Sequence, residues 1–435
     1  MDPSLLRRFL RHPRVLVSLV VLVALVVPLG VVAHGRHDAA ATPQAQLIAG
    51  SYGVTTLTRQ TSNADFARGA GRGTRYSDGS LTMAGRAGVR SVAGRTYSWS
   101  RWTSAWVSPG QRFTSLLPSW SARTRQGSWI QVMVRVRDSR GRLSGFKNLG
   151  RWTSGDATFR RVSRGSQSDT VARVATDTLL AQPGVQLTGY QLRVQLMRRE
   201  GRAAPVLRSV QAAVSLLPST TPTTSKPLSA TAASLPVPGY SQMTHRGQHP
   251  QYGGGGEAWC SPTSLSMVLG YYGRLPSARA YRWVPSSYAD RWVNHVARLT
   301  YDYRYRGTGN WAFNTAVAAN RVVDAFVTRM ANLRMAERFV RAGIPLVVSV
   351  RFGRGQLTGA PISSTPGHLL VLSGFTASGD PVVMDPAAPR NSTVRRVYDR
   401  AQFERAWLDG SGGMAYVVRN KAHPLPARPS GVRAW

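Results

Sequence analysis

The stretch WCSPTSLSMVLGYYG, residues 259–273, carries the strongest structural signal in the chain. Pro262 suits the first turn of a helix, where its missing N–H leaves no hydrogen bond unmade, and Gly273 is typical just beyond a helix end. Apolar side chains recur between them at the spacing of an α-helix, at Leu265, Val268, Leu269 and Tyr272. We therefore predict a helix that begins at or beside Cys260.

Cys260 is the single cysteine of the chain, and it lies beside the positive end of the predicted helix dipole. This position favours the thiolate form of a cysteine, which is the nucleophilic form. A buried structural thiol is the alternative interpretation. The glycine run at residues 253–256 places the thiol after a flexible loop instead of within an apolar element. The local sequence therefore favours a nucleophile at Cys260.

A second motif supplies a base and a carboxylate. The segments GHLLVL (367–372) and PVVM (381–384) predict two strands joined by a tight glycine-containing turn. Because the far ends of a hairpin meet, we expect His368 and Asp385 to lie together. A lone histidine beside a strand is more often structural, but a neighbouring carboxylate can orient an imidazole that serves a thiol as its base. The pairing therefore favours a catalytic role for both residues.

Six motifs follow one another between residues 236 and 418: VPGYSQ, WCSPTSLSMVLGYYG, GNW, AGIPLVVSV, GHLLVLSGF and MDPAAP. Together they resemble the secreted, stand-alone branch of the bacteriocin-leader (double-glycine) peptidase-like family of papain-like cysteine peptidases. The resemblance implies an α+β papain-like fold with Cys260 as nucleophile, His368 as general base and Asp385 as orienting acid. It also implies that the Gln242 amide and the Cys260 backbone N–H form the oxyanion hole.

Two features depart from the family pattern. Ser261 stands where the family commonly has glycine, which would alter how closely a substrate backbone approaches. An insertion rich in glycine and histidine, residues 243–257, separates Gln242 from Cys260. We expect this insertion to form a mobile flap over the site.

The insertion also contains His245 and His249, four residues apart, which raises the question of a metal site. Gly247 and Pro250 oppose a helix there, and the sequence places no third ligand. The chain has neither a G-x-S-x-G elbow nor a G-x-x-x-x-G-K-[ST] loop. We therefore expect no metal and no cofactor.

Residues 49–217 predict an all-β domain. Apolar and polar side chains alternate along 130–137 and 190–197, as in strands with one buried face, and turn signals separate such runs. The natural architecture is a β-sandwich, which broadly resembles the jelly-roll accessory domains of secreted hydrolases. Six tryptophans in this region could fill its core or bind sugar rings, and the core is favoured: Trp99, Trp102, Trp106, Trp120, Trp129 and Trp152. One or two could instead contact a cell-wall polymer at the surface.

The chain as a whole is predicted to be multidomain. The β-sandwich is followed by a Pro-, Ser- and Thr-rich linker at 218–235, which predicts an extended segment. An α+β papain-like cysteine peptidase domain then occupies 236–420. The last residues, 421–435, are basic and rich in proline and predict a disordered tail.

Residues 1–41 indicate the compartment. Several arginines precede an almost uninterrupted apolar run at 15–33, which is typical of a secretory signal or of an uncleaved signal anchor. Small-residue sites at 31–33 and 39–41, together with Pro28, favour cleavage. The protein is therefore expected to be secreted or anchored to the outer face of the cytoplasmic membrane.

The formal net charge is +37, and the cationic residues are spread along the chain. No nucleic-acid-binding motif accompanies the charge, so no nucleic-acid partner is expected. A surface of this kind should still attract anionic polymers or lipid headgroups.

These observations predict an extracytoplasmic cysteine peptidase-like hydrolase that cleaves an amide bond of a peptide or protein. Two alternatives remain open at this level. One is amide or acyl transfer on cell-wall peptides by the same fold. The other is a catalytically silent domain that binds peptide or cell-wall polymer.

Overall fold

The computed structural model describes residues 54–217 and 222–435. The segment predicted as a signal or anchor, residues 1–41, lies outside the described residues. Within the described residues, no helix is both long and apolar enough to cross a membrane.

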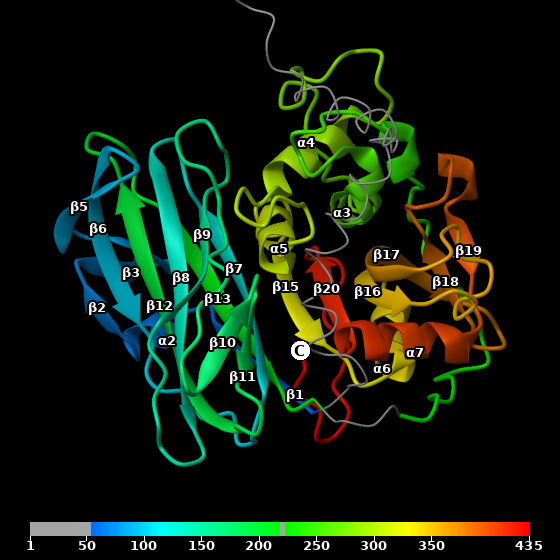
Figure 1. Ribbon diagram of the computed structural model, residues 1–435, viewed down its shortest axis with the longest axis horizontal. Helices are drawn as coiled ribbons and strands as arrows, with labels where there is room; N and C mark the ends of the chain where they lie inside the picture. Colours follow the sequence, from blue (N-terminus) through cyan, green and yellow to red (C-terminus); the bar gives the residue numbers. More distant parts are fainter. Residues whose placement is uncertain (1–53, 218–221) are drawn as a thin grey trace, which may run out of the picture. The chain divides into compact units, whose positions relative to one another are not determined.

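The N-terminal region consists of two antiparallel sheets (Figure 1). The first has the strand order β10-β11-β7-β13-β4-β3, with β1 also paired to β13. The second has the order β2-β6-β12-β8-β9, with β5 paired to β6. The elements are β1 (Thr55–Gln60), α2 (Asn63–Ala67), β2 (Ala70–Arg72), β3 (Thr74–Ser77), β4 (Ser80–Met83), β5 (Gly88–Val92), β6 (Arg95–Thr103), β7 (Ser115–Arg123), β8 (Ser128–Asp138), β9 (Lys147–Trp152), β10 (Ala172–Ala175), β11 (Thr178–Ala181), β12 (Leu187–Arg198) and β13 (Val206–Ser215).

The predicted period-two alternation places one face of β8 and β12 in a shared core. Val132 on β8 and Val194 on β12 are cross-strand neighbours, and both are fully buried. The same core includes Trp120 on β7 and Val210 on β13, so residues of both sheets meet in it. This arrangement confirms the predicted β-sandwich. Four of the six tryptophans are buried, namely Trp102, Trp120, Trp129 and Trp152, and the other two, Trp99 and Trp106, are partly exposed.

The C-terminal region is an α+β domain around a third antiparallel sheet, with the order β15-β20-β16-β17-β18-β19 and with β14 paired to β17 (Figure 1). Its strands are β14 (Ala233–Ser234), β15 (Asp324–Arg329), β16 (Leu346–Phe352), β17 (Thr365–Phe375), β18 (Pro381–Met384), β19 (Arg395–Val397) and β20 (Met414–Arg419). Its helices are α3 (Cys260–Tyr271), α4 (Arg291–Thr300), α5 (Trp311–Ala319), α6 (Leu333–Arg341) and α7 (Arg400–Ser411), with the short 3-10 helices η1 (Gln242–His245), η2 (Gly256–Ala258) and η3 (Asn391–Thr393).

Helices cover both faces of this third sheet. Apolar residues of α3 and α5 pack with Val347, Leu369 and Val371 on one face. Residues of α6 and α7 pack with Val348 and Leu370 on the other face. Since successive residues of a strand point to opposite faces, β16 and β17 are apolar on both sides, as the sequence of 346–350 and 369–372 shows.

The two regions share a buried interface, and all of the described residues belong to one compact unit. Trp120 of the sandwich packs edge-on against Phe313 of α5, with 6.1 Å between ring centroids. The Asp177 carboxylate, at the turn between β10 and β11, accepts a hydrogen bond from the backbone N–H of Trp311, the first residue of α5. The sandwich therefore stabilises the start of a helix in the C-terminal α+β domain.

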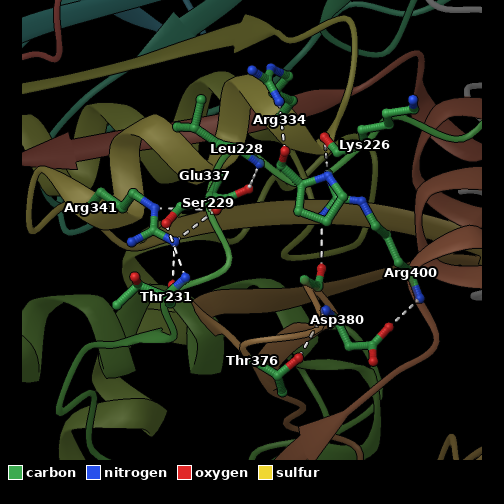
Figure 2. Close-up of polar contacts among 12 residues, drawn as sticks. Lys226, Leu228, Ser229, Thr231, Arg334, Glu337, Arg341, Thr376, Asp380 and Arg400 are labelled. Atoms are coloured by element: carbon green, nitrogen blue, oxygen red, sulfur yellow. Dashed lines mark hydrogen bonds and ion pairs between the residues drawn. The ribbon is translucent and has the colours of Figure 1, made fainter.

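The described part of the linker lies against α6 and α7 (Figure 2). Glu337 accepts a hydrogen bond from the Leu228 backbone N–H at 2.7 Å and pairs with Arg341 at 2.9 Å. Arg334 donates to the Pro227 carbonyl at 2.6 Å. These contacts explain why residues without apolar periodicity are held in one place: their backbone groups bind charged side chains.

The structure corrects the prediction that residues 421–435 form a disordered tail. Trp435 is buried and packs edge-on against Phe339, with 4.9 Å between the rings, and its indole N–H donates to the Pro426 carbonyl. The Ala434 carbonyl accepts a hydrogen bond from the Thr328 hydroxyl. The polar and proline-rich composition concealed one large apolar side chain, and a single tryptophan can bury enough area to order a short segment.

Candidate functional site

Helix α3 begins at Cys260, as the sequence predicts, and Gly273 beyond its end adopts the left-handed conformation with φ +62°. Two hydroxyl groups fix the first turns of the helix against the sheet. The Ser264 hydroxyl donates to the Leu369 carbonyl at 3.1 Å, and the Ser261 hydroxyl lies 3.1 Å from the Tyr416 hydroxyl. Because Leu369 directly follows His368, the bond from Ser264 holds α3 beside the strand that carries the histidine. Cys260 itself is only partly buried.

His368 lies on β17 and is 3% exposed. Its Nε2 atom is 2.8 Å from Oδ1 of Asp385, and the ring also forms a hydrogen bond with Cys260. Burial disfavours the charged imidazolium, but Asp385 and then Cys260 outweigh it and raise the pKa of His368 to about 10. The histidine is therefore protonated at neutral pH while it stands between the thiol and the carboxylate.

Asp385 directly follows β18 and is almost completely buried. Burial opposes its ionisation, but His368, the Ala387 backbone N–H at 2.9 Å and the Tyr398 hydroxyl at 2.8 Å hold the pKa of its carboxyl below the usual value. The carboxylate therefore stays ionised, and its second oxygen is fixed by Tyr398. Sequence reasoning missed Tyr398, since no motif marks it and only the fold of 385–398 brings it to Asp385.

Gln242 is 5% exposed and lies close to both chain segments that carry the site. Its backbone N–H donates to the carbonyl of Pro386, the residue after Asp385, at 2.8 Å. Its side-chain Nε2 donates to the carbonyl of Glu257, three residues before Cys260, at 2.6 Å. One amide hydrogen of Gln242 is therefore engaged and the other is left for a further acceptor.

The insertion at 243–257 is packed, which differs from the mobile flap that its composition suggests. Its two ends touch at η1 and η2, where a side chain at Gly256 would meet the His245 backbone at 2.3 Å. The Trp259 indole N–H donates to the Tyr252 carbonyl at 2.6 Å, which ties the loop to the residue before Cys260. His245 binds Gln248 through Nδ1 at 3.1 Å. His245 thus contributes to the packing of the loop. No group of three or more metal-binding side chains occurs in residues 54–217 and 222–435.

Two tyrosines near the thiol also went undetected in the sequence. Tyr305 and Tyr416 both interact electrostatically with Cys260, and burial, before any charge, raises the pKa of each phenol. Both hydroxyl groups therefore stay neutral around the thiol. Tyr305 belongs to the loop before α5 and Tyr416 to β20, so only the tertiary fold brings them together.

Comparisons with known proteins assign both regions of the chain. Residues 56–215 match the peptidase C39 N-terminal domain, and residues 234–413 match the Peptidase C39 like family, a family of cysteine peptidases. A crystal structure of a Bacillus anthracis protein described as a C39-like peptidase is 15% identical, with a TM-score of 0.29, over 43% of this chain and 98% of that chain. No curated protein matches the chain. Over these ranges the chain is therefore similar to a peptidase C39 N-terminal domain followed by a C39-like peptidase domain.

Proposed function

We propose that this protein is a cysteine peptidase that cleaves an amide bond with Cys260 as nucleophile, His368 as base and acid, and Asp385 as the group that orients the imidazole. One observation carries the proposal: His368 bridges the only thiol of the chain and a buried, ionised carboxylate. The family to which residues 234–413 are matched supports a peptide as the substrate class.

The geometry supports a two-step reaction. The Cys260 sulfur attacks the carbonyl carbon of the peptide bond, and His368 gives its proton to the departing amine nitrogen as the C–N bond breaks. The product of this step is an acyl-enzyme thioester and a free amine. His368 then takes a proton from water, the water oxygen attacks the thioester carbon, and the acid product leaves as the thiol returns to its starting state.

We propose that Gln242 assists both steps through its free amide hydrogen. The tetrahedral intermediate carries negative charge on the former carbonyl oxygen, and an N–H donor aimed at that oxygen lowers the barrier. The contacts of Gln242 with Pro386 and Glu257 support this role because they hold the residue between the segments that carry Asp385 and Cys260.

We also propose that the reaction takes place outside the cytoplasmic membrane. The support is the pattern of residues 1–41, where arginines precede an apolar run as in exported proteins. Detection of the protein in the medium or on protease-accessible cell surfaces would support this location, and its recovery only from the cytoplasm would contradict it.

The activity is tested by incubating the purified protein with peptide libraries and cell-wall peptide fragments and measuring newly formed amines. We expect the wild-type protein to release amines and the Cys260→Ala variant to lose several orders of magnitude of rate. Thermal unfolding of the variant controls for folding. A Cys260→Ala variant that hydrolyses the same substrate at the wild-type rate would overturn the proposal.

A further inference from the structure

The outer face of the second sandwich sheet carries a cluster of arginines. We call this cluster the arginine face and define it by Arg72, Arg90, Arg101, Arg135, Arg151 and Arg193. Four of them, Arg101, Arg135, Arg151 and Arg193, alternate along their strands with side chains that point into the sandwich core, such as Trp102 after Arg101 and Val194 after Arg193. Arg72 and Arg90 belong to the same face through the pairing of β2 and β5 with β6. The face therefore belongs to the sheet formed by β2, β6, β12, β8 and β9, together with β5.

The strand register arranges these side chains in rows. Arg72 on β2 is the cross-strand neighbour of Arg101 on β6, which in turn neighbours Gln195 on β12. The row continues through Gln131 on β8 to Arg151 on β9. Since neighbouring strands lie about 4.8 Å apart, a row across five strands spans roughly 19 Å. This length exceeds what a single small anion can contact.

Four of the six arginines of this face donate hydrogen bonds to neutral side chains. Arg135 donates to the Gln191 side chain at 2.6 Å, and Arg193 donates to the Thr103 hydroxyl at 3.1 Å. Arg90 and Arg151 donate in the same way to the side-chain oxygens of Gln195 and Gln131, at 2.8 Å and 3.1 Å. None of the ion pairs found among residues 54–217 and 222–435 includes an arginine of this face.

The positive charges of the arginine face repel one another. Burial, followed by the charges of Arg101 and Arg135, lowers the pKa of Arg193 to about 10. Burial and then the charge of Arg90 also lower the pKa of Arg151. Placing several cations close together without carboxylates is electrostatically unfavourable. A bound anion would offset the repulsion between these arginines.

Aromatic rings orient these guanidinium groups. Arg193 stacks over Phe146 at 3.6 Å from the ring centroid, and Arg135 lies over the same ring at 4.9 Å. Arg72 lies over Trp99 at 5.7 Å. Because arginines cover these rings, the rings are less open to stacking by a nucleic-acid base or a sugar. The surface is built to present guanidinium groups, which bind phosphate oxygens in a bidentate manner.

We propose that the arginine face binds a linear polymer with a phosphodiester in every repeat and a flexible polyol backbone. A row of cations spaced across the strands fits a polymer that carries a phosphate in each repeat. A polymer backbone without bases needs no exposed aromatic ring to stack on. This inference concerns the N-terminal domain and does not depend on the chemistry proposed at Cys260.

The test measures binding of fluorescent poly(glycerol phosphate) to the full chain by anisotropy at several salt concentrations. The variant combines Arg101→Gln, Arg135→Gln and Arg193→Gln. The matched control combines Arg274→Gln, Arg279→Gln and Arg282→Gln, which removes the same charge from exposed positions in the peptidase-like domain. We expect at least about tenfold weaker binding for the first variant and less than about twofold for the control, with the salt slope reduced by roughly 2 for three lost contacts.

Three results would overturn the proposal. Equal losses in both triple variants would mean that net charge alone attracts the polymer. Tighter binding of single-stranded DNA with the same number of phosphates would mean that bases are recognised. Unchanged binding after loss of the arginines would place the polymer elsewhere.

A folding control keeps the test decisive. Removing mutually repelling cations should leave the thermal unfolding temperature of the first variant unchanged or higher. If that variant nevertheless fails to fold, the set Arg72→Gln, Arg90→Gln and Arg151→Gln is measured in its place under the same criteria.

Discussion

The Nε2 atom of His368 lies 2.8 Å from the Oδ1 atom of Asp385, although the two residues are 17 positions apart in the chain. The β17–β18 pairing places Val371 opposite Met384, so Asp385, one residue beyond Met384, lies beside the part of β17 that precedes Val371 and contains His368. The carboxylate therefore acts directly on the imidazole, and several measurable properties depend on this contact.

The first prediction concerns the pH dependence of the activity. The folded protein raises the pKa of His368 from 6.5 to about 10, so the imidazolium persists at neutral pH and is lost as the pH rises through about 10. The stability that this shift contributes is fully present below about 6.5 and is lost over the same rise in pH. We expect the alkaline limb of kcat/KM to fall near pH 10 in the wild type. Asp385→Asn should move this limb to lower pH, because Asp385 is the main group that raises the pKa.

The control for this experiment is Asp78→Asn, a substitution of an exposed aspartate in the sandwich. It should leave the pH profile unchanged. An alkaline limb that stays in place in Asp385→Asn would show that the carboxylate does not govern the protonation of His368.

The second prediction concerns Tyr398, whose hydroxyl donates to Oδ2 of Asp385 at 2.8 Å. Tyr398→Phe removes a hydrogen bond to a charged group, which is typically worth about 1.5–3 kcal/mol. We expect about tenfold lower kcat/KM, because the carboxylate is less firmly held. Tyr76→Phe, at an exposed position, serves as the control.

The Tyr398→Phe variant can also be tested by measuring the pH at which it unfolds in acid. The lowered pKa of Asp385 contributes stability that is present above its unfolded pKa and is lost as the pH falls through its folded value. Tyr398→Phe removes one of the groups that lower this pKa. The acid unfolding midpoint should therefore move to higher pH, and an unchanged midpoint together with unchanged activity would rule out a positioning role for Tyr398.

The third prediction concerns Gln242. If its amide stabilises the oxyanion, Gln242→Ala should lower kcat by roughly two to three orders of magnitude and change KM much less. Gln251→Ala, an exposed glutamine of the same insertion, is the matched control. A change confined to KM would assign Gln242 to substrate binding, and no change in either constant would remove it from the reaction.

The fourth prediction concerns Arg161, a fully buried residue of the sandwich. Its side chain forms hydrogen bonds with the peptidase-like domain. Its guanidinium donates to the Arg298 carbonyl at 2.7 Å and to the Gly155 carbonyl at 2.9 Å. It also donates to the buried carbonyls of Thr153 at 3.3 Å and Tyr301 at 3.4 Å. Arg161→Met removes these donors, and a buried acceptor left unsatisfied costs about 1–3 kcal/mol. We expect the free energy of unfolding to fall by roughly 3 kcal/mol in denaturant titrations.

The exposed Arg164→Met substitution provides the comparison, and it should have little effect. We also expect both domains to unfold in one transition, since they belong to one compact unit. Two separate transitions in the wild type, or an Arg161→Met variant as stable as the control, would contradict the interface described above.

Much of the fold could be predicted from local sequence. The alternation along 130–137 and 190–197 has the period of a strand, and the spacing of Leu265, Val268 and Leu269 has the period of a helix, so each pattern shows which side must be buried. The hairpin turn between β17 and β18 is also local, and it was enough to predict the proximity of His368 and Asp385.

The amino-acid sequence by itself determined the element types, the two-domain order and the residues to suspect, because periodicity, turn chemistry and helix termini are short-range properties. Only the tertiary structure decided which distant groups surround them: Tyr398 at Asp385, Tyr305 and Tyr416 near Cys260, and Trp435 in the core. The arginine face is also a product of strand register, which places residues far apart in the chain in one row. Such contacts depend on how elements pack, and a pattern read along one strand or helix contains no information about its neighbours in space.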